Sequence, residues 1–409
     1  MQKYKKNLIS VNEAKKKLSQ SLKDFKNTSE SIHIKDSVNR VLSEDILSLN
    51  DIPRYDNSAI DGFAINYKSI KKNIKKFKVI GQSKPGNPFK KKLGIGEAIE
   101  VFTGSYILQK NNIDTVCYIE NCNVKDRYVT ILKSSEKGEN VRRSGEDVKK
   151  NGVVFKKGRK IRTVDLAQLS SLGIKKIKVY RKIKVGIFSS GDEINTRESK
   201  SKFIIHDANK IVLLSLTKKV GCEAFDLGII KDDLKQTKNI IDKNLSKFDL
   251  IITSGGISQS NIDNIGKYFF KSGKIDFWRL SIKPGRPIAF GQIKGKPFIG
   301  LPGNPVAAVV TFIMLVACYL KEFTGNIEQK NTVRLIPSNF SMKKKVGRTE
   351  WLRGSIKVIN NKQYLEKFKT SGSGIISSIS QSDGIIEIDE KVEYIRKGTI
   401  LKFFRFEDI

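Results

Sequence analysis

The sequence predicts an α/β and β multidomain protein, in which a central three-layer α/β/α domain with a mostly parallel sheet is joined to smaller β-rich domains. Three observations lead to this fold class. Between residues 178 and 324, continuous apolar runs alternate with segments of helical periodicity, which is typical of a parallel sheet covered on both faces. From residue 77 to 132, strand-like segments are separated by Gly, Pro, Asn and Lys clusters, which favours a small inserted β domain. Short strand-like segments return after Gly325.

The N-terminal part of the chain contains helical and extended signals. Apolar residues at helical spacing predict a helix over Ser10–Leu22, with Ser10 or Asn12 as its cap. A short extended stretch, Glu30–Val41, follows, and a polar loop then leads into a strand. The strands expected in the inserted β-rich domain are Phe77–Ile80, Ala98–Phe102, Thr115–Ile119 and Tyr128–Ile131. A turn-rich stretch follows, and Thr163–Leu172 is expected to be a helix that ends at Gly173.

The central region carries the alternating pattern of a doubly covered sheet. Its expected strands are Val185–Phe188, Ala224–Ile230, Leu250–Thr253, Ile288–Phe290 and Phe298–Leu301. Its expected helices are Asn209–Val220, Asp233–Leu245, Asn264–Ser272 and Val306–Phe323. In the last part of the chain, strands are expected at Thr332–Ile336, Trp351–Ile359, Gln363–Phe368, Ile385–Ile388 and Thr399–Phe403. They predict a β-barrel or sandwich of about 80 residues, an ordinary domain size.

Length and composition describe a folded protein with an unusual charge. The chain has 409 residues, enough for roughly two to four domains. A net charge of +35 would suit nucleic acid or an acidic membrane, but the lysines are spread from Lys3 to Lys402 and form no single basic block. We therefore expect a solvated, lysine-rich surface and no dedicated nucleic-acid or membrane partner.

Cysteine spacing and apolar stretches bear on the compartment. The four cysteines show no C-x-x-C spacing, so reduced, mostly buried thiols are expected in place of a zinc site. The basic stretch from Met1 to Lys17 lacks the apolar core of a signal peptide. Val306–Leu320, the longest apolar stretch, falls short of the ~20 residues that span a bilayer, which favours a buried helix. We expect a cytoplasmic protein.

Three of the predicted strands end in glycine-containing loops. These loops run from Ser189 to Glu193, from Thr253 to Ser258 and from Gly300 to Pro305. Ligands of parallel sheets bind at the carboxyl ends of strands, where glycine N–H groups and helix starts can approach an anion. Three such loops in one sheet predict a single site for a phosphorylated or otherwise anionic small molecule.

Charged residues lie in or near these loops. The carboxylates there are Asp192, Glu193, Asp232, Asp233 and Asp263. They could hold Mg²⁺ together with phosphates, although Asp233 could equally be a helix cap. Arg279, Lys283 and Arg286 lie in a Pro-Gly segment that suits oxyanion recognition, although a lysine-rich protein could also carry them in an ordinary exposed loop. With His33 and His206 as its only histidines, the chain gives little support to nucleophilic hydrolysis.

Six short motifs occur in an order that resembles a known family. They are Asp56-Asn-Ser-Ala-Ile-Asp-Gly62, Asn140-Val-Arg-Arg-Ser-Gly-Glu-Asp147, Ser190-Gly-Asp-Glu193, Ser254-Gly-Gly-Ile-Ser258, Lys283-Pro-Gly-Arg-Pro287 and Gly300-Leu-Pro-Gly-Asn-Pro305. This order resembles that of the molybdopterin molybdenumtransferases, a family that includes the E domain of gephyrin. The likeness covers nearly the whole chain and extends to Gly347-Arg-Thr-Glu-Trp-Leu-Arg353 and Ser371-Gly-Ser-Gly374.

The resemblance implies an elongated homodimer of four-domain chains. Residues 1–44 and 140–177 would form a discontinuous N-terminal domain, and residues 45–139 the inserted β-rich domain. Residues 178–326 would form the molybdopterin-binding α/β domain, and residues 327–409 a C-terminal β-barrel-like domain. The family's active site joins the sheet domain of one subunit to the inserted domain of the other. Contact with the molybdopterin adenylyltransferase is also expected.

The implied reaction is the Mg²⁺-dependent insertion of molybdate into adenylylated molybdopterin, with release of AMP. The catalytic positions carried over by motif are Asp61, Thr103, Asp147, Glu193, Asp232, Asp263, Arg279 and Lys283. The expected ligand-binding positions are Ser190, Gly191, Asp192, Ser254, Gly255, Gly256, Ser258, Arg286, Pro302, Gly303, Asn304 and Pro305. The expected metal ligands are Glu193, Asp232 and Asp263.

The chain departs from the family pattern after Ser258. After Ser258 the chain has Gln259-Ser260-Asn261, where the family usually has a small residue, Gly and Glu. This departure removes one carboxylate and could alter metal affinity or rate.

Two alternative functions stay open from the sequence. A related pterin- or nucleotide-processing enzyme with the same sheet domain is one alternative. The other is a gephyrin-like scaffold that has lost catalysis.

Overall fold

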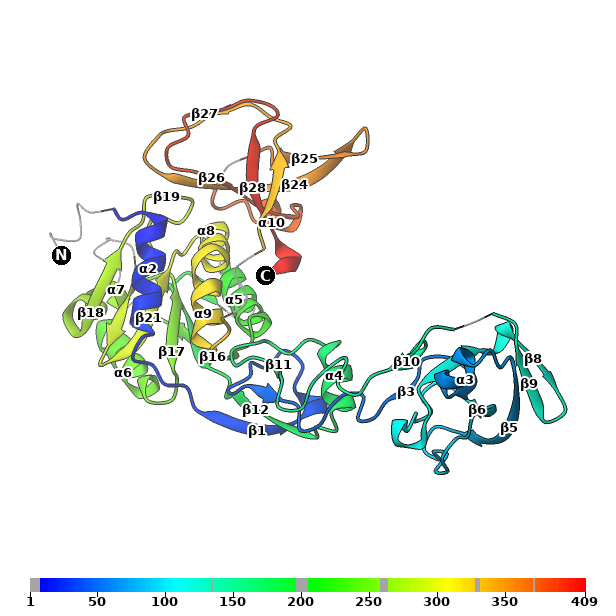
Figure 1. Ribbon diagram of the computed structural model, residues 1–409. Coiled ribbons are helices and arrows are strands. Elements are labelled where there is room, and N and C mark those ends of the chain that lie inside the picture. The colour runs from blue at the N-terminus through cyan, green and yellow to red at the C-terminus, as the bar shows by residue number, and fades with distance from the viewer. Residues whose placement is uncertain are drawn as a thin grey trace.

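The chain folds into an elongated molecule with its domains arranged in a row. The computed structural model describes residues 8–133, 135–195, 205–231, 233–257, 264–327, 332–370 and 372–409. Figure 1 shows a large body at one end, a narrow waist, and a small β-rich domain at the far end. The C-terminal domain stacks on the large body, on the side away from the waist.

The first described helix packs on the central domain. Helix α2 (Val11–Ser21) begins after Ser10, whose side chain accepts a hydrogen bond from the Glu13 N–H, so the predicted helix and its cap are confirmed. Its buried face, Val11, Ala14 and Leu18, belongs to the main core of the central domain. This face lies against helix α9 (Ala317–Phe323).

The waist joins two segments that are distant in sequence. Strand β1 (Ser29–His33) pairs antiparallel with β12 (Lys176–Tyr180), and β2 (Ile46–Leu47) pairs with β11 (Val153–Phe155). Helix α4 (Asp165–Ser171) and a 3-10 turn, η1 (Ile34–Asp36), complete it. The two chain segments share one small core, formed by Leu42, Ile46, Ile161, Leu169, Ile177 and Val179.

The inserted domain at the far end is built around one six-stranded sheet. Strand β3 (Asn57–Ser58) and β10 (Val141–Arg142) pair where the chain enters and leaves it. The sheet order is β7-β4-β6-β5-β9-β8. The bounds are β4 Gly62–Ile65, β5 Lys76–Ser83, β6 Glu97–Val101, β7 Thr115–Tyr118, β8 Cys122–Lys125, β9 Tyr128–Ile131, α3 Tyr67–Lys71, η2 Gln109–Asn111 and η3 Ile119–Asn121. Two apolar clusters make up its core.

The central domain has three layers, as predicted. Its sheet order is β16-β13-β17-β21-β20-β18, in which the first four strands run parallel. The bounds are β13 Lys184–Ser190, β14 Ile194–Asn195, β15 Ile205–His206, α5 Ala208–Lys219, β16 Glu223–Ile230, α6 Leu234–Leu245, β17 Leu250–Ser254, α7 Asn264–Ser272, β18 Gly273–Trp278, β20 Ala289–Ile293 and β21 Lys296–Leu301. In β17, Leu250 and Ile252 enter one core and Ile251 the other. Burial on both faces explains the continuous apolar runs.

One edge of this sheet differs from the expected pattern. Strand β20, predicted as Ile288–Phe290, pairs antiparallel with both β21 and β18. No strand was expected in the Pro-Gly segment that carries Arg279, Lys283 and Arg286, but Trp278 ends strand β18 and Ile282–Lys283 forms strand β19. A tight turn at Lys294 and Gly295, both with positive φ, reverses the chain and makes this edge antiparallel.

A long apolar helix closes the main core. It runs through α8 (Pro305–Thr311), a π-helical turn η4 (Phe312–Val316) and α9. By length and composition alone the stretch Pro305–Phe323 could cross a membrane, but 89% of its apolar window is buried inside the protein. The predicted buried helix is therefore confirmed.

The C-terminal domain is a β structure that captures one strand of the central domain. Strand β19 pairs with β24, so the sheet order is β19-β24-β26-β28-β22, with β25 paired to β24. The bounds are β22 Arg334–Pro337, β23 Met342–Lys343, β24 Thr349–Ile359, β25 Lys362–Lys367, α10 Ser377–Ser380, β26 Gly384–Ile388, β27 Tyr394–Ile395, β28 Ile400–Arg405 and η5 Phe406–Asp408. The shared sheet fixes this domain next to the strand ends of the central one.

Candidate active site

Three strand ends meet at one edge of the central sheet. Strands β13, β17 and β21 are parallel neighbours, so the loops after Ser190, Ser254 and Leu301 emerge on the same side. Gly255, with a φ of 89°, lies between the other two loops. A Cβ on it would come 2.7 Å from the Ser190 carbonyl oxygen and 3.9 Å from Gly303 Cα. Glycine alone adopts this conformation easily and leaves this room. The structure therefore brings the three glycine loops together.

A cavity of about 840 Å³ opens at this edge, and we call it the strand-end cavity. Its volume lies in the range of small-molecule sites. The residues predicted from sequence that line it are Ser190, Glu193, Ser254, Lys283, Arg286, Pro302, Gly303, Asn304 and Pro305. The predicted residues Gly191, Asp192, Gly255 and Gly256 belong to the same loops but are not part of the described lining.

The C-terminal domain closes one side of the strand-end cavity. Asn304 Nδ2 donates a hydrogen bond to Ser373 Oγ at 3.1 Å, and the Val306 N–H donates to the Ser373 carbonyl oxygen at 3.3 Å. Ser373, Gly374 and Ile376 form part of the lining. The start of helix α8 is thus held against the C-terminal domain, and the cavity lies between two domains.

Two cations reach the cavity from the segment between β18 and β20. Lys283 lies on strand β19, and the Leu280 N–H donates to the Arg286 carbonyl oxygen at 3.1 Å, which closes the loop. Arg279, at the base of the loop, has a φ of 94° and lies beside, not among, the described residues of the lining. The loop therefore directs Lys283 and Arg286 at the cavity.

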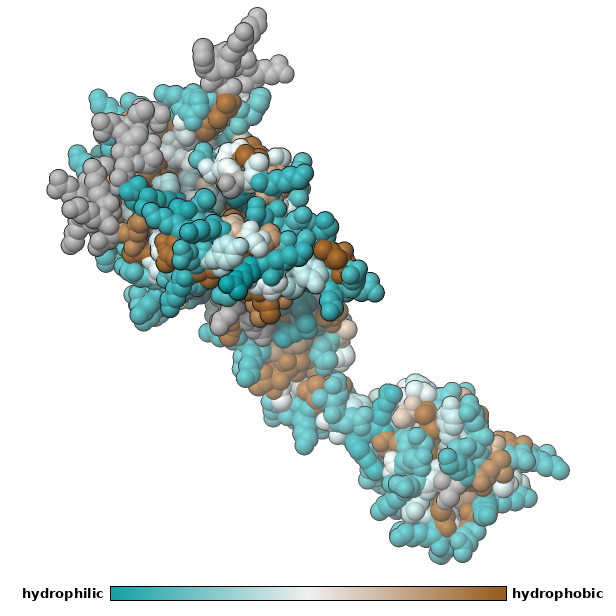
Figure 2. Space-filling model, turned by 90° about the horizontal axis from the view of Figure 1, so that it is seen from above, coloured by the Kyte–Doolittle hydropathy of each residue, from teal (hydrophilic) through white to brown (hydrophobic). Residues whose placement is uncertain are grey.

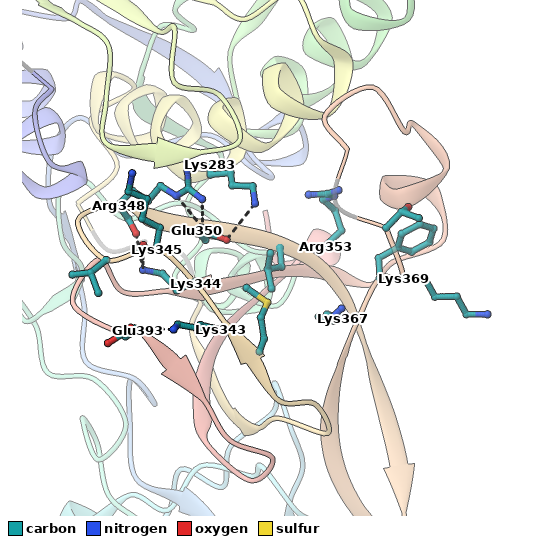
Figure 3. A pocket seen from close by; sticks show the side chains of 15 residues that line it. Lys283, Lys343, Lys344, Lys345, Arg348, Glu350, Arg353, Lys367, Lys369 and Glu393 are labelled. Carbon is teal, nitrogen blue, oxygen red and sulfur yellow. Dashed lines mark hydrogen bonds and ion pairs between the residues drawn. The ribbon is translucent and has the colours of Figure 1, made fainter. Parts of the chain in front are cut away.

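A second pocket, of about 880 Å³, lies on the C-terminal domain and is strongly basic (Figure 3). We call it the basic pocket. Its charged lining residues are Lys283, Lys343, Lys344, Lys345, Arg348, Arg353, Lys367 and Lys369, with the acids Glu350 and Glu393. Lys283 lines both this pocket and the strand-end cavity, so the two sites adjoin.

Arg353 is the most buried cation of the basic pocket, with 3% of its surface exposed. Its Nε donates to Ser378 Oγ at 3.0 Å, and its Nη2 donates to the Gly372 carbonyl oxygen at 3.3 Å. Both partners are neutral. Burial lowers the pKa of the guanidinium, which nevertheless stays charged at neutral pH. A buried charge bonded to neutral groups is well placed to receive an anion.

The other buried charges of the basic pocket are partly compensated. Glu350 Oε1 accepts from Arg348 Nε at 3.0 Å and from Nη2 at 2.8 Å, while its Oε2 lies 3.8 Å from Lys283 Nζ. Lys344 Nζ donates to the Arg348 carbonyl oxygen at 2.9 Å. Burial lowers the pKa of Lys344, and nearby Glu350 opposes part of that effect. Arg348 and Lys283 are thereby fixed on the pocket wall.

Three predicted catalytic residues, Asp61, Thr103 and Asp147, line neither the strand-end cavity nor the basic pocket of their own chain. Asp61 Oδ1 accepts from the Thr103 N–H at 2.7 Å and from its hydroxyl at 2.8 Å. These bonds, the backbone one first, hold the pKa of Asp61 below its ordinary value. Asp147 is exposed, and its N–H donates to the Ile52 carbonyl oxygen at 3.1 Å. In Figure 1 the waist separates the inserted domain, which carries Asp61 and Thr103, from the strand ends.

Family models match the chain in three consecutive parts. The model described as "MoeA N-terminal region (domain I and II)" matches residues 9–173, "Probable molybdopterin binding domain" matches residues 186–322, and "MoeA C-terminal region (domain IV)" matches residues 336–406. A molybdopterin molybdenumtransferase of Haemophilus influenzae is 33% identical over 400 residues, which is 96% of this chain and 97% of that protein. The chain belongs to the MoeA family of molybdopterin molybdenumtransferases.

Other MoeA relatives agree over the full length. The crystal structure of a molybdopterin biosynthesis MoeA protein from Pyrococcus horikoshii has a TM-score of 0.84 and 29% identity, covering 98% of this chain and 100% of the other. Gephyrin of Dictyostelium discoideum is 27% identical over 97% of this chain, which corresponds to 62% of gephyrin. The resemblance inferred from the motifs and the multidomain α/β fold class are therefore confirmed.

One of the three carboxylates predicted to bind a metal ion lies in the part of the chain that the structure describes. Asp232, Asp263 and Ser258 lie outside the described residues. Glu193 is exposed and lines the strand-end cavity, and one or two carboxylates together with substrate phosphates are what Mg²⁺ usually takes from a protein. Within the described ranges, no group of three or more His, Cys, Asp or Glu side chains could hold a metal ion. Glu193 is therefore the one predicted metal ligand that the described residues place at the strand-end cavity.

Several residues of this MoeA site escaped the sequence-based prediction. His206, Asp207 and Asn209 line the strand-end cavity, although none of them was among the predicted site residues. Arg353 was noticed only as part of a family motif. A signal for Asp207 existed, because Asp directly before a helical segment is a common cap. The positions of Asn209 and Arg353 depend on contacts with distant segments.

Proposed function

We propose that this chain is a molybdopterin molybdenumtransferase that inserts molybdate into adenylylated molybdopterin and releases AMP. The observation that carries the proposal is the adjacency of two anion-receiving sites that share Lys283. One is the strand-end cavity with its glycine loops and a helix start, which suit a phosphate. The other is the basic pocket with Arg353, which suits a dianionic oxyanion.

The residues of the chain have separate tasks in this reaction. The glycine loops and Arg286 bind the adenylyl phosphate in the strand-end cavity, and Arg353 and Lys344 hold molybdate in the basic pocket. Lys283 stands between the two and neutralises charge that develops on the departing phosphate. Glu193 would take part in holding Mg²⁺, whose positive charge would stabilise the pyrophosphate group when bound. The reaction requires no protein nucleophile.

A homodimer would complete the site. The ionised Asp61 carboxylate is held by hydrogen bonds from Thr103. Both residues belong to the inserted domain, which lies at the far end of the molecule from the strand-end cavity of its own chain. Leu47, Leu49 and Val153 are exposed, and Leu47 and Val153 are register partners of β2 and β11 in the waist. Figure 2 shows apolar side chains grouped on the waist. Exposed apolar patches of this kind mark interaction surfaces. In the dimer, Asp61 would reach the partner's cavity.

Two further parts of the proposal concern the cell. We place the enzyme in the cytoplasm. We also expect contact with a molybdopterin adenylyltransferase, the class of enzyme that would supply the adenylylated substrate.

An assay of AMP release tests the proposal. The purified chain with adenylylated molybdopterin, Mg²⁺ and molybdate should release AMP and form active cofactor. Replacing Arg353 by Lys should raise the KM for molybdate about tenfold or more, because the bidentate fork is lost. The matched variant Lys369→Ala, at an exposed rim position, should keep a KM close to wild type. No AMP release by the wild-type chain would refute the enzyme and favour a scaffold.

A further inference from the structure

The first turn of helix α5 ties two of the glycine loops together. Asn209 Nδ2 donates to Ser254 Oγ at 2.7 Å and to the Gly303 carbonyl oxygen at 2.7 Å. Ser254 Oγ in turn donates to the Pro302 carbonyl oxygen at 3.3 Å. Asn209 is 6% exposed and lines the strand-end cavity. One carboxamide thus spans the loop after β17 and the loop after β21.

The orientation of this carboxamide follows from its partners. The Gly303 carbonyl oxygen can only accept, so the Asn209 atom next to it has to be the nitrogen. Oδ1 then points the other way, where it is buried without a hydrogen-bond partner among the described residues. An unpaired buried acceptor is unfavourable for stability. An apolar side chain of the same shape would avoid that, so packing alone does not explain an asparagine here.

The backbone of Asn209 is held firmly. Asp207 Oδ1 accepts from the N–H groups of Asn209, at 3.1 Å, and Lys210, at 3.0 Å, and so caps the helix. Lys210, which is buried, has its Nζ 3.1 Å from Asp226 Oδ1 and 3.9 Å from Asp207 Oδ2. The cap and the ion pairs anchor the helix start to strand β16. The Asn209 side chain therefore reaches the two loops from a fixed base.

We propose that Asn209 is a positioning residue that holds the Ser254 and Gly303 loops at the separation that binds the adenylyl phosphate. This inference rests on the proposed function for the identity of the ligand. Among the described residues, the hydrogen bonds that would still join the two loops without those of Asn209 are the one from Ser254 to Pro302 and the one from the Gly255 N–H to the Leu301 carbonyl oxygen, at 3.0 Å. The backbone groups facing the phosphate would then lose their fixed spacing.

The test uses the full-length chain and AMP as the probe. Asn209→Leu keeps the shape without the donors, and Asn209→Asp keeps the shape but sets a carboxylate against the Gly303 carbonyl oxygen. Both should weaken AMP binding, measured by calorimetry, by about tenfold or more, the effect of losing well-placed hydrogen bonds. Their kcat for AMP release should fall, while the KM for molybdate stays near wild type, because the basic pocket is untouched.

The controls separate positioning from folding. Asn244→Leu removes a helical asparagine that donates to the Ile240 carbonyl oxygen on helix α6, and it should bind AMP as the wild type does. If Asn209→Leu fails to fold, Asn209→Ser, which is too short to reach both loops, decides with the same measurement. Wild-type AMP affinity in folded Asn209 variants would overturn the inference. AMP binding by a wild-type chain without turnover would overturn the proposed function alone.

Discussion

Arg279 holds a backbone conformation that arginine seldom adopts. Its φ is 94°, and it is fixed because its N–H donates to the Ile288 carbonyl oxygen at 2.9 Å while the next residue, Leu280, bonds the Arg286 carbonyl oxygen. Such conformations cost about 1–3 kcal/mol and cluster at functional sites. A glycine would adopt this conformation without strain. The strain is therefore consistent with a functional demand for the guanidinium.

Replacing Arg279 by Gly should separate stability from activity. Relief of strain should offset the greater chain entropy of glycine, so the free energy of unfolding should stay within about 1 kcal/mol of wild type or rise above it. AMP release should fall about tenfold or more, since a positive charge beside the strand-end cavity is lost. Urea unfolding and the AMP assay measure the two effects. Arg279→Lys, which keeps the charge, is the control and should retain more turnover. Full activity in the glycine variant would show that the cation has no part in the reaction.

At the residue scale, the sequence predicted those site residues whose roles depend on local backbone. Glycines and prolines after a buried strand indicate a turn near a ligand, and Ser190, Gly303 and Pro305 were found this way. Arg353 and Asn209 could not be found so, because their partners lie in other segments of the chain. Side chains whose function depends on long-range contacts show no spacing that a sequence can reveal.

At the scale of elements, helix α4 is held in the waist by ion pairs at its first residue. Asp165, at its start, has a side chain that is only 3% exposed and accepts from Arg162 Nη2 at 2.8 Å, from Arg159 Nη2 at 3.0 Å and from the Arg162 N–H at 2.9 Å. Burial alone would raise the pKa of Asp165, but the bonds from Arg162 and Arg159 outweigh it and hold the pKa well below the usual range. The charged carboxylate therefore stabilises the fold.

The pH dependence of this carboxylate can be predicted with its sign. Because the pKa of Asp165 is depressed in the folded state, its carboxylate adds to the free energy of unfolding above the ordinary Asp pKa of about 4. This contribution is lost progressively as the pH falls below that value. Asp165→Asn should reduce the free energy of unfolding by about 2 kcal/mol at pH 7, and its difference from wild type should shrink in acid. Unfolding midpoints at pH 7 and pH 3 measure this, with the exposed Asp126→Asn as control. A difference that is independent of pH would contradict the assignment.

The elements themselves were predictable where their signals are local. Helix α2 was found from Ser10 and the apolar spacing that follows, and β13, β17 and β21 from their apolar runs. Strand β18 was missed because it follows α7 without an intervening turn and pairs antiparallel with β20, which lies beyond β19 in the chain. Strand β19 was missed because its partner, Thr349–Glu350, belongs to another domain. The four domain ranges stay a prediction.

At the scale of the whole molecule, the net charge and the elongated shape both bear on how anions could be bound. The net charge of +35 is spread over a mostly hydrophilic surface, so it attracts anions in general (Figure 2). Selectivity has to come from the basic pocket, where Arg353 and Lys344 are buried and held by fixed partners. The elongated shape leaves Asp61 and Thr103 without access to that pocket in their own chain. A second chain would supply what the first one lacks.

Subunit complementation is the sharpest test of this composite site. Asp61→Asn alters the inserted domain and Lys283→Ala the strand-end cavity, so each homodimer should be nearly inactive. In a dimer formed from one chain of each kind, one site receives both changes and the other receives neither. An equal, fully exchanged mixture should therefore recover about a quarter of the wild-type AMP release, because half of the dimers are mixed and each has one intact site of two. The control pair Lys283→Ala and Arg286→Ala changes the same side of the site, so every site of its mixed dimers stays damaged and no activity should return. Equal recovery in both mixtures, or none in the first once exchange is verified by mass spectrometry, would show that Asp61 does not act across a subunit interface.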